Sequence, residues 1–101
     1  MDFRHLLEKA KNLEKALAEL DENLKGHETE GTAGSGAVTV KVNGAGDVTA
    51  LTIDPELVAT GDTPLIEQTI LAALGQATEA SRAYREAQRA RLVGGLELPE
   101  F

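Results

Sequence analysis

The fold of this chain is decided by residues 34–57, which read GSGAVTVKVNGAGDVTALTIDPEL. Valines alternate with polar residues at positions 38 to 42, and a period of two indicates a strand with one buried and one wet face. After the glycine-rich residues 43–46 the alternation resumes, and the side chains expected on one face are Thr49, Leu51 and Ile53. These residues therefore predict a β-hairpin. The pair Asp54-Pro55 ends its second strand, because proline cannot donate to a strand ladder.

A long helix is predicted before the hairpin, over residues 2–24. Apolar residues recur there at alternating spacings of three and four, which is a heptad seam. The seam consists of Phe3, Leu6, Ala10, Leu13, Leu17, Leu20 and Leu24. Asp2 is the expected N-cap, and Gly26 lies just past the expected end.

A second long helix is predicted from Pro64 to Val93, with Thr63 as its N-cap and Pro64 at the first helical position. Its seam consists of Ile66, Ile70, Ala73, Ala77, Ala80, Tyr84 and Ala87, and the small alanines should let another helix approach closely. Such a helix extends about 45 Å, whereas strands of about seven residues reach about 23 Å. The helices must overhang the sheet, and their uncovered seams predict a homodimer.

Composition limits the classes of protein that this chain can be. A length of 101 residues fits one domain. The absence of cysteine excludes disulfides and thiolate metal sites. No apolar run approaches the roughly 20 residues that span a bilayer, and the first residues lack the apolar core of a signal peptide. We expect a cytoplasmic protein without a membrane partner.

The sequence predicts no catalytic, metal or cofactor site. Its glycines form no phosphate-binding motif and are interpreted as turn and bulge residues. His5 and His27 are far apart and lack the spacing of metal ligands. Ser35 and Ser81 lack the sequence context of a nucleophile. We therefore expect no enzyme activity, no cofactor and no small-molecule substrate.

The one candidate site is basic, although the net charge of the chain is −7. Arg82, Arg85 and Arg89 share one face of the second long helix, and Arg91 is close by. Arginine there can bind phosphate oxygens through two parallel hydrogen bonds. A structural interpretation is nearly as good, because cations near a helix C-terminus complement its dipole and can pair with Glu79 or Glu86.

The first helix holds a weaker basic candidate. Lys11 and Lys15 are one helical turn apart, and Arg4 lies nearer the N-terminus. Acidic neighbours such as Glu8 and Glu14 dilute the positive field of these residues. We include Lys11, Lys15 and Arg4 as candidate contacts to nucleic acid.

The order of these pieces resembles the YbaB/EbfC family of bacterial nucleoid-associated proteins. The motifs are V-x-V-x-V at 38–42, Asn-Gly-x-Gly at 43–46, Ile-Asp-Pro at 53–55 and Gly-Gly-Leu-x-Leu-Pro-x-Phe at 94–101. The resemblance covers nearly the whole chain and implies a single α+β domain, residues 1–101. Its implied order is a long helix, a three-stranded antiparallel β-meander and a long helix (α-β-β-β-α). Residues 27–33, which are polar, become an edge strand of the meander.

The resemblance also implies a function. Such a protein would be a homodimer that binds duplex DNA in the nucleoid and helps to organise or regulate the chromosome. Because the sequence lacks a helix-turn-helix signature and stacking aromatics on a basic sheet, we expect contacts to phosphates, low sequence specificity and strong salt dependence.

A second function stays open, that of a protein-interaction scaffold without direct DNA contact. Residues 96–101, LELPEF, form an apolar tail that can dock into the groove of a partner or fold back over its own dimer. The family usually has glycine where Glu100 stands, and this departure adds negative charge near the helical ends.

Overall fold

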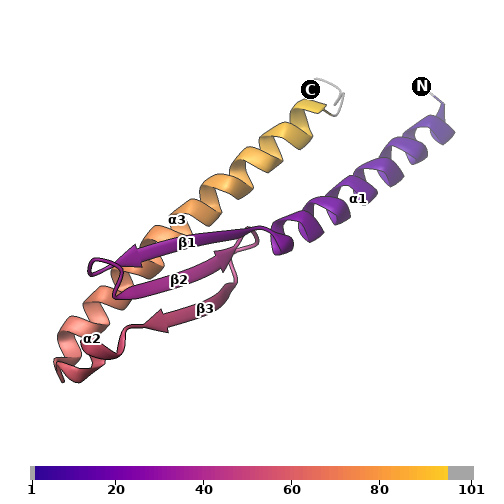
Figure 1. Cartoon of the computed structure of the whole chain (residues 1–101). Coiled ribbons are helices and arrows are strands. Elements are labelled where there is room, and N and C mark those ends of the chain that lie inside the picture. Colours follow the sequence, from indigo (N-terminus) through magenta and orange to yellow (C-terminus); the bar gives the residue numbers. More distant parts are fainter. Residues whose placement is uncertain (1, 96–101) are drawn as a thin grey trace.

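The computed structural model describes residues 2–95 and contains one small sheet and two long helices. The elements are α1 (Phe3–Gly26), β1 (Glu28–Ala33), β2 (Val38–Asn43), β3 (Val48–Ile53), α2 (Pro55–Ala59) and α3 (Thr63–Gly95). The strands pair antiparallel in the order β1-β2-β3, and α3 crosses one face of the sheet (Figure 1). This confirms the predicted α-β-β-β-α order, including β1 as an edge strand, with the short helix α2 added before α3.

The core is a thin layer between β2 and α3. Val38, Val40 and Val42 are at most 1% exposed and pack against the buried Ala73 and Ala77 of α3. The buried stripe of α3 recurs at every fourth residue and consists of Thr69, Ala73, Ala77 and Ser81. The valine face of the hairpin is therefore buried as predicted.

Strand β1, and not another helix, occupies the small-residue stripe of α3. A Cβ atom built on Gly31 would overlap the carbonyl oxygen of Ala73 and the backbone of Ala77, so this close approach requires glycine. Nearby, the Thr29 hydroxyl donates to the carbonyl oxygen of Val42 at 2.7 Å and lies 3.1 Å from the carbonyl oxygen of Ala77. The alanines of α3 thus permit a close contact, but with a strand of the same chain.

We expect the Gly31→Ala variant to be destabilised by about 1 to 3 kcal/mol, because the added methyl group overlaps backbone atoms of α3 that cannot move independently. Thermal unfolding followed by circular dichroism measures this loss. The matched control is Gly75→Ala on the exposed side of α3, where nothing lies within 4 Å of the added Cβ. Helix propensity should make that control more stable by about 0.5 to 1 kcal/mol. Equal melting temperatures for the two variants would contradict the close approach of β1 to α3.

Strand β3 differs from the predicted pattern. Its register pairs Leu51 with Val40 but Val48 with Val42, so Thr49 is an extra residue in a β-bulge. Directly opposite residues share a face of the sheet. Val48 therefore joins Leu51 on the side of α3, and the prediction that Thr49 lies with Leu51 on that face is wrong.

Among the described residues, the apolar side of β3 is covered only at Ile53, which packs against the core. Helix α3 packs on β1 and β2, and it leaves Val48 56% and Leu51 50% exposed. We call the surface formed by Val48 and Leu51 the β3 shelf. It continues the valine face of β2 beyond the edge of the helix.

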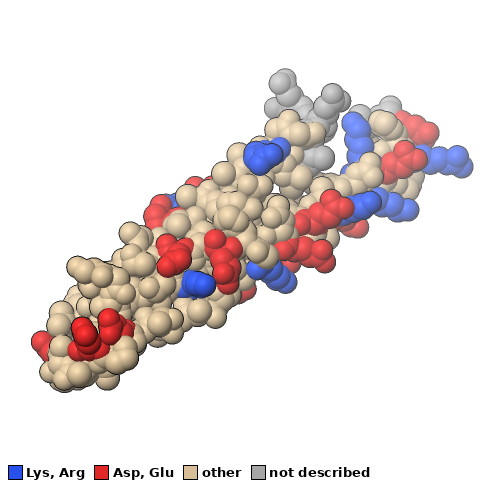
Figure 2. Space-filling model, in the orientation of Figure 1, with Lys and Arg blue, Asp and Glu red and all other residues tan. Residues whose placement is uncertain are grey.

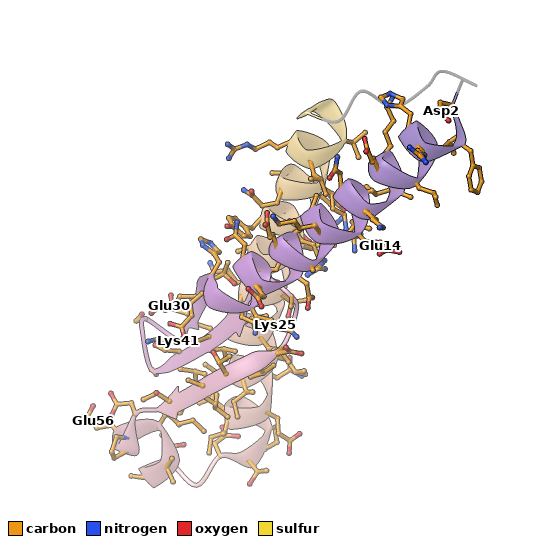
Figure 3. The ribbon with its side chains drawn as sticks, turned by 90° about the vertical axis from the view of Figure 1, so that its right-hand side faces the viewer. Asp2, Glu14, Lys25, Glu30, Lys41 and Glu56 are labelled. Atoms are coloured by element: carbon orange, nitrogen blue, oxygen red, sulfur yellow. The ribbon has the colours of Figure 1, made fainter. Side chains whose placement is uncertain are left out.

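The opposite face of the sheet is polar. Thr32, Thr39 and Thr52 lie opposite one another across the three strands, and Glu30 is paired in register with Lys41 (Figure 3). This face accounts for the polar half of the alternating pattern.

The N-terminal ends of the long helices are capped by short polar side chains as predicted, but the C-terminal end of α1 and the N-cap of α3 differ from the predicted residues. Asp2 caps α1 as predicted, but α1 continues through Gly26. At the start of α3, the carboxylate of Asp62 accepts from the amide of Leu65 at 3.1 Å. Asp62 therefore acts as the N-cap, and Thr63 lies inside the helix, because a short acidic side chain reaches this amide directly.

The chain is long and thin. Its radius of gyration is 19.7 Å, whereas a compact chain of this length has about 13 Å. Helices α1 and α3 both extend beyond the sheet and run antiparallel to each other, so the two ends of the described chain lie at the same end of the molecule (Figure 1). We call residues 3–20 and 86–95 the arms and residues 21–85 the body. Within residues 2–95, no helix is long and apolar enough to cross a membrane.

Candidate nucleic-acid interface

Charge is divided between the arms and the body. The arms hold six Lys or Arg against four Glu, a formal charge of +2, while the body holds four Lys or Arg against ten Asp or Glu, a formal charge of −6. The remaining −3 of the net charge of −7 comes from Asp2, Glu97 and Glu100, which lie outside both ranges. Figure 2 shows basic side chains interspersed with acidic ones toward the free ends of the helices, and mainly acidic side chains over the sheet end. Only the arms therefore have a net charge that attracts phosphate.

Arg82 is engaged on its own helix. Its guanidinium lies 2.6 Å from a carboxylate oxygen of Glu79 and 3.0 Å from one of Glu86. Hydrogen bonding to Glu79 and then the attraction of both carboxylates raise the pKa of Arg82 above its ordinary value. The guanidinium stays charged, but two adjacent anions cancel its field. This is the ion pairing that the sequence left open for Arg82.

Arg85 points at the sheet. Its Nη1 donates to the carbonyl oxygen of Gly44 at 3.0 Å and lies 3.4 Å from the Ser81 hydroxyl. The side chain is half-buried, and it connects α3 to the turn between β2 and β3. Its first role in this structure is thus to hold that turn.

Arg89 and Arg91 lie on different sides of the α3 arm. At about 100° per residue they are about 160° apart around the helix. Arg89 is exposed. Arg91 lines a cleft of about 300 Å³ between α1 and α3, together with Ala16, Glu19, Leu20, Asn23, Gln88 and Leu92. The four candidate arginines of α3 therefore do not form one cluster.

The candidates on α1 do form one row. Lys11, Lys15 and Arg4 fall within about 40° of one another around the helix, on the side opposite the buried Leu24. All three are exposed, and none forms a salt bridge within residues 2–95. Glu8 lies on the same side of the helix and reduces the charge of the row. The outer side of α1 thus offers three cations to a ligand.

A set of contacts that sequence reasoning missed joins the arms to the body. The ring of His27 stacks on the ring of Tyr84, with centroids 3.6 Å apart and planes 6° apart. The Tyr84 hydroxyl lies 3.2 Å from the side-chain oxygen of Asn23 and donates to it. We call Asn23, His27, Gly44 and Tyr84 the arm joint. The hint in the sequence was Tyr84, an aromatic residue among the alanines in the second half of the α3 seam.

Taken together, the fold and the charge pattern define a class of protein. It is an α-β-β-β-α protein whose two long helices project beyond a small sheet and present cations near their free ends (Figures 1 and 2). The chain belongs to the YbaB/EbfC DNA-binding family, whose model matches residues 1–96.

Individual relatives match this chain over nearly their whole length, and one solved structure shares its fold. A nucleoid-associated protein of Anaeromyxobacter sp. (strain Fw109-5) is 38% identical over 98% of this chain and 96% of its own. A nucleoid-associated protein of Chloroflexus aurantiacus is 34% identical over 96% of this chain and 97% of its own. The crystal structure of an uncharacterized protein from Helicobacter pylori superposes with a TM-score of 0.84 at 26% identity, covering 93% of this chain and 99% of that one.

Proposed function

We propose that this protein is a homodimer that binds duplex DNA through its arms, mainly at phosphates and with low sequence specificity. The observation that carries the proposal is the division of charge, +2 on the arms and −6 on the body of each chain. Because DNA repels the body, the arms are the surface that can approach it. Membership of a DNA-binding family and the nucleoid-associated relatives support this assignment.

Exposed surface supports the homodimer. The chain exposes 7241 Å², whereas a compact monomer of this mass exposes about 5,500 Å². The excess is larger than the roughly 800 Å² that each partner buries in a standard interface. The β3 shelf and the uncovered seam of α1, where Phe3 is 74% and Leu6 53% exposed, supply apolar surface for a second copy.

The kind of contact follows from the arms themselves. Their exposed cations lie on regular helices, and Phe3 is the one Phe, Tyr or Trp among residues 3–20 and 86–95. Cations of this kind position a protein on phosphates without reading bases. We therefore propose that the protein helps to organise the chromosome in the nucleoid, within the cytoplasm, and does not act at one particular operator site.

A titration of the protein with duplex DNA at about 50 and 200 mM salt tests this function. Several phosphate contacts from two pairs of arms should lower the affinity by a factor of about 10³ or more between these two conditions. Two unrelated duplex sequences should bind within a few-fold of each other. Binding that is insensitive to salt, or no binding at the lower salt concentration, would contradict the proposal.

One observation favours a second candidate, the protein-interaction scaffold. The end of the α1 arm is apolar as well as basic, since Leu6 is 53% and Leu7 47% exposed next to Phe3. Such a surface suits a protein partner. The tail that also suggested this function, residues 96–101, lies outside the described residues. Purified protein that leaves DNA unshifted at about 50 mM salt, yet retains one defined protein partner, would favour the scaffold.

A further inference from the structure

Helix α1 is packed against the rest of the chain only toward its C-terminal end. Leu24 in its last turns is buried, and Leu13, Ala16 and Leu20 are half-buried, whereas the N-terminal half is exposed. With 24 residues the helix is about 36 Å long. A rotation of about 10° at its C-terminal end would therefore move its tip by about 6 Å. Within one chain, the contacts at that end determine where the arm cations lie.

The first of these contacts is the ring stack. His27 follows the last residue of α1, and its ring lies parallel to that of Tyr84 on α3 at a centroid distance of 3.6 Å. The Tyr84 hydroxyl donates to Asn23 in the last turns of α1 at 3.2 Å. The Tyr84 side chain of α3 thus contacts both Asn23, near the end of α1, and His27, the residue that follows α1.

The second contact is with the turn between β2 and β3. The Gly44 amide donates to the carbonyl oxygen of His27 at 2.7 Å. A Cβ atom on Gly44 would lie 2.7 Å from the carbonyl oxygen of Leu24 and 3.0 Å from the Tyr84 ring. The same turn is tied to α3, because the buried Ser81 hydroxyl donates to the carbonyl oxygen of Asn43 at 2.6 Å. The end of α1 is therefore enclosed by groups that are themselves fixed to α3.

We propose that His27 and Tyr84 are positioning residues that set the angle between the arms of one chain, and thereby the spacing of the arm cations along DNA. They carry out this role without touching the ligand, and the DNA half of the inference rests on the proposed function. Pre-organised cations bind a regular phosphate array better than cations on a mobile arm, because less conformational entropy is lost on binding.

The test measures the arm spacing directly. The chain contains no cysteine, so spin labels can be placed on cysteines introduced at the exposed Asn12 and Ala90, one on each arm. Labelled chains are diluted with unlabelled chains, and the distance distribution is read by double electron–electron resonance. We expect a narrow distribution in the parent and in Tyr84→Phe, which keeps the stack. Tyr84→Ala and His27→Ala should broaden it, and duplex DNA affinity should fall about tenfold at an unchanged salt slope.

The outcomes separate the two hypotheses. An unchanged distance distribution in His27→Ala, a variant that leaves α3 intact, would overturn the positioning role even if Tyr84→Ala failed to fold. A salt slope that falls together with the affinity would also count against it, because the variants remove no cation. The distance distributions of the two alanine variants could broaden while the parent fails to bind DNA at low salt. That result would support the positioning role of His27 and Tyr84 and contradict the proposed function.

Discussion

Removing three free cations from the arms of each chain is expected to weaken the binding of duplex DNA strongly. The variant is Lys11→Gln, Lys15→Gln and Arg89→Gln, three exposed side chains without salt bridges among residues 2–95. Each phosphate contact that is lost lowers the salt slope by about one unit. A dimer loses six charges, so its affinity should fall at least about 100-fold at moderate salt.

The matched control removes the same charge from the body, as Lys25→Gln, Lys41→Gln and Arg82→Gln. These cations lie 3.1 Å from Asp21, 4.0 Å from Glu28 and 2.6 Å from Glu79, respectively. Because carboxylates already neutralise them, the control should bind DNA within a few-fold of the parent. Gel shifts and fluorescence anisotropy measure both variants. An equal loss of affinity in the two triple variants would contradict an interface on the arms.

This design departs from the arginine cluster that the sequence suggested. Replacing Arg82, Arg85 and Arg89 together would mix three different roles. Arg82 is paired with two glutamates and Arg85 holds the carbonyl of Gly44, so only Arg89 is left free on that face. Loss of DNA binding in such a variant would not separate a lost phosphate contact from a displaced turn.

The second large effect is expected at the β3 shelf, where Leu51→Asp should dissociate the homodimer. Leu51 is 50% exposed in the single chain, so the protomer should tolerate a carboxylate there. In a dimer that covers the shelf, the same carboxylate would be buried without a partner, which costs several kcal/mol. Light scattering should show a mass near 10.7 kDa for the variant and about twice that mass for the parent.

Thr52→Asp is the control for the shelf. Thr52 is the next residue of the same strand and lies opposite Thr39 on the polar face of the sheet, so it should leave the dimer intact. The Leu51→Asp monomer should also bind DNA more weakly than the parent, because two pairs of arms act together only in a dimer. A dimeric mass for Leu51→Asp would place the interface on another surface, and a monomeric parent would exclude the homodimer.

Much of the fold could be predicted because its signals are local. The alternating valines of residues 38–42 specify a one-sided strand wherever they lie, and the three-and-four spacing in α1 specifies a helix with an apolar side. The overhang followed from length alone, since a helix of 33 residues must exceed strands of six residues. These features need no knowledge of what each element packs against.

Features that depend on a neighbour were missed. The bulge at Thr49 arises from the match between β3 and β2, and it exchanges Thr49 for Val48 on the apolar side. Gly31 is needed because the backbone of α3 lies against it, more than forty positions away in the sequence.

The class of fold, the length of the arms and the presence of cations on them could be read from the sequence, because periodicity, chain length and side-chain charge are properties of single segments. Which of the cations are free depends on the folded chain. Arg82 and Arg85 are three residues apart on one helix, yet one faces two glutamates and the other faces the carbonyl of Gly44. Arg82 is paired within its own helix, whereas the contact of Arg85 depends on the turn against which α3 packs. Contacts between segments so far apart in sequence form only when the whole chain is folded.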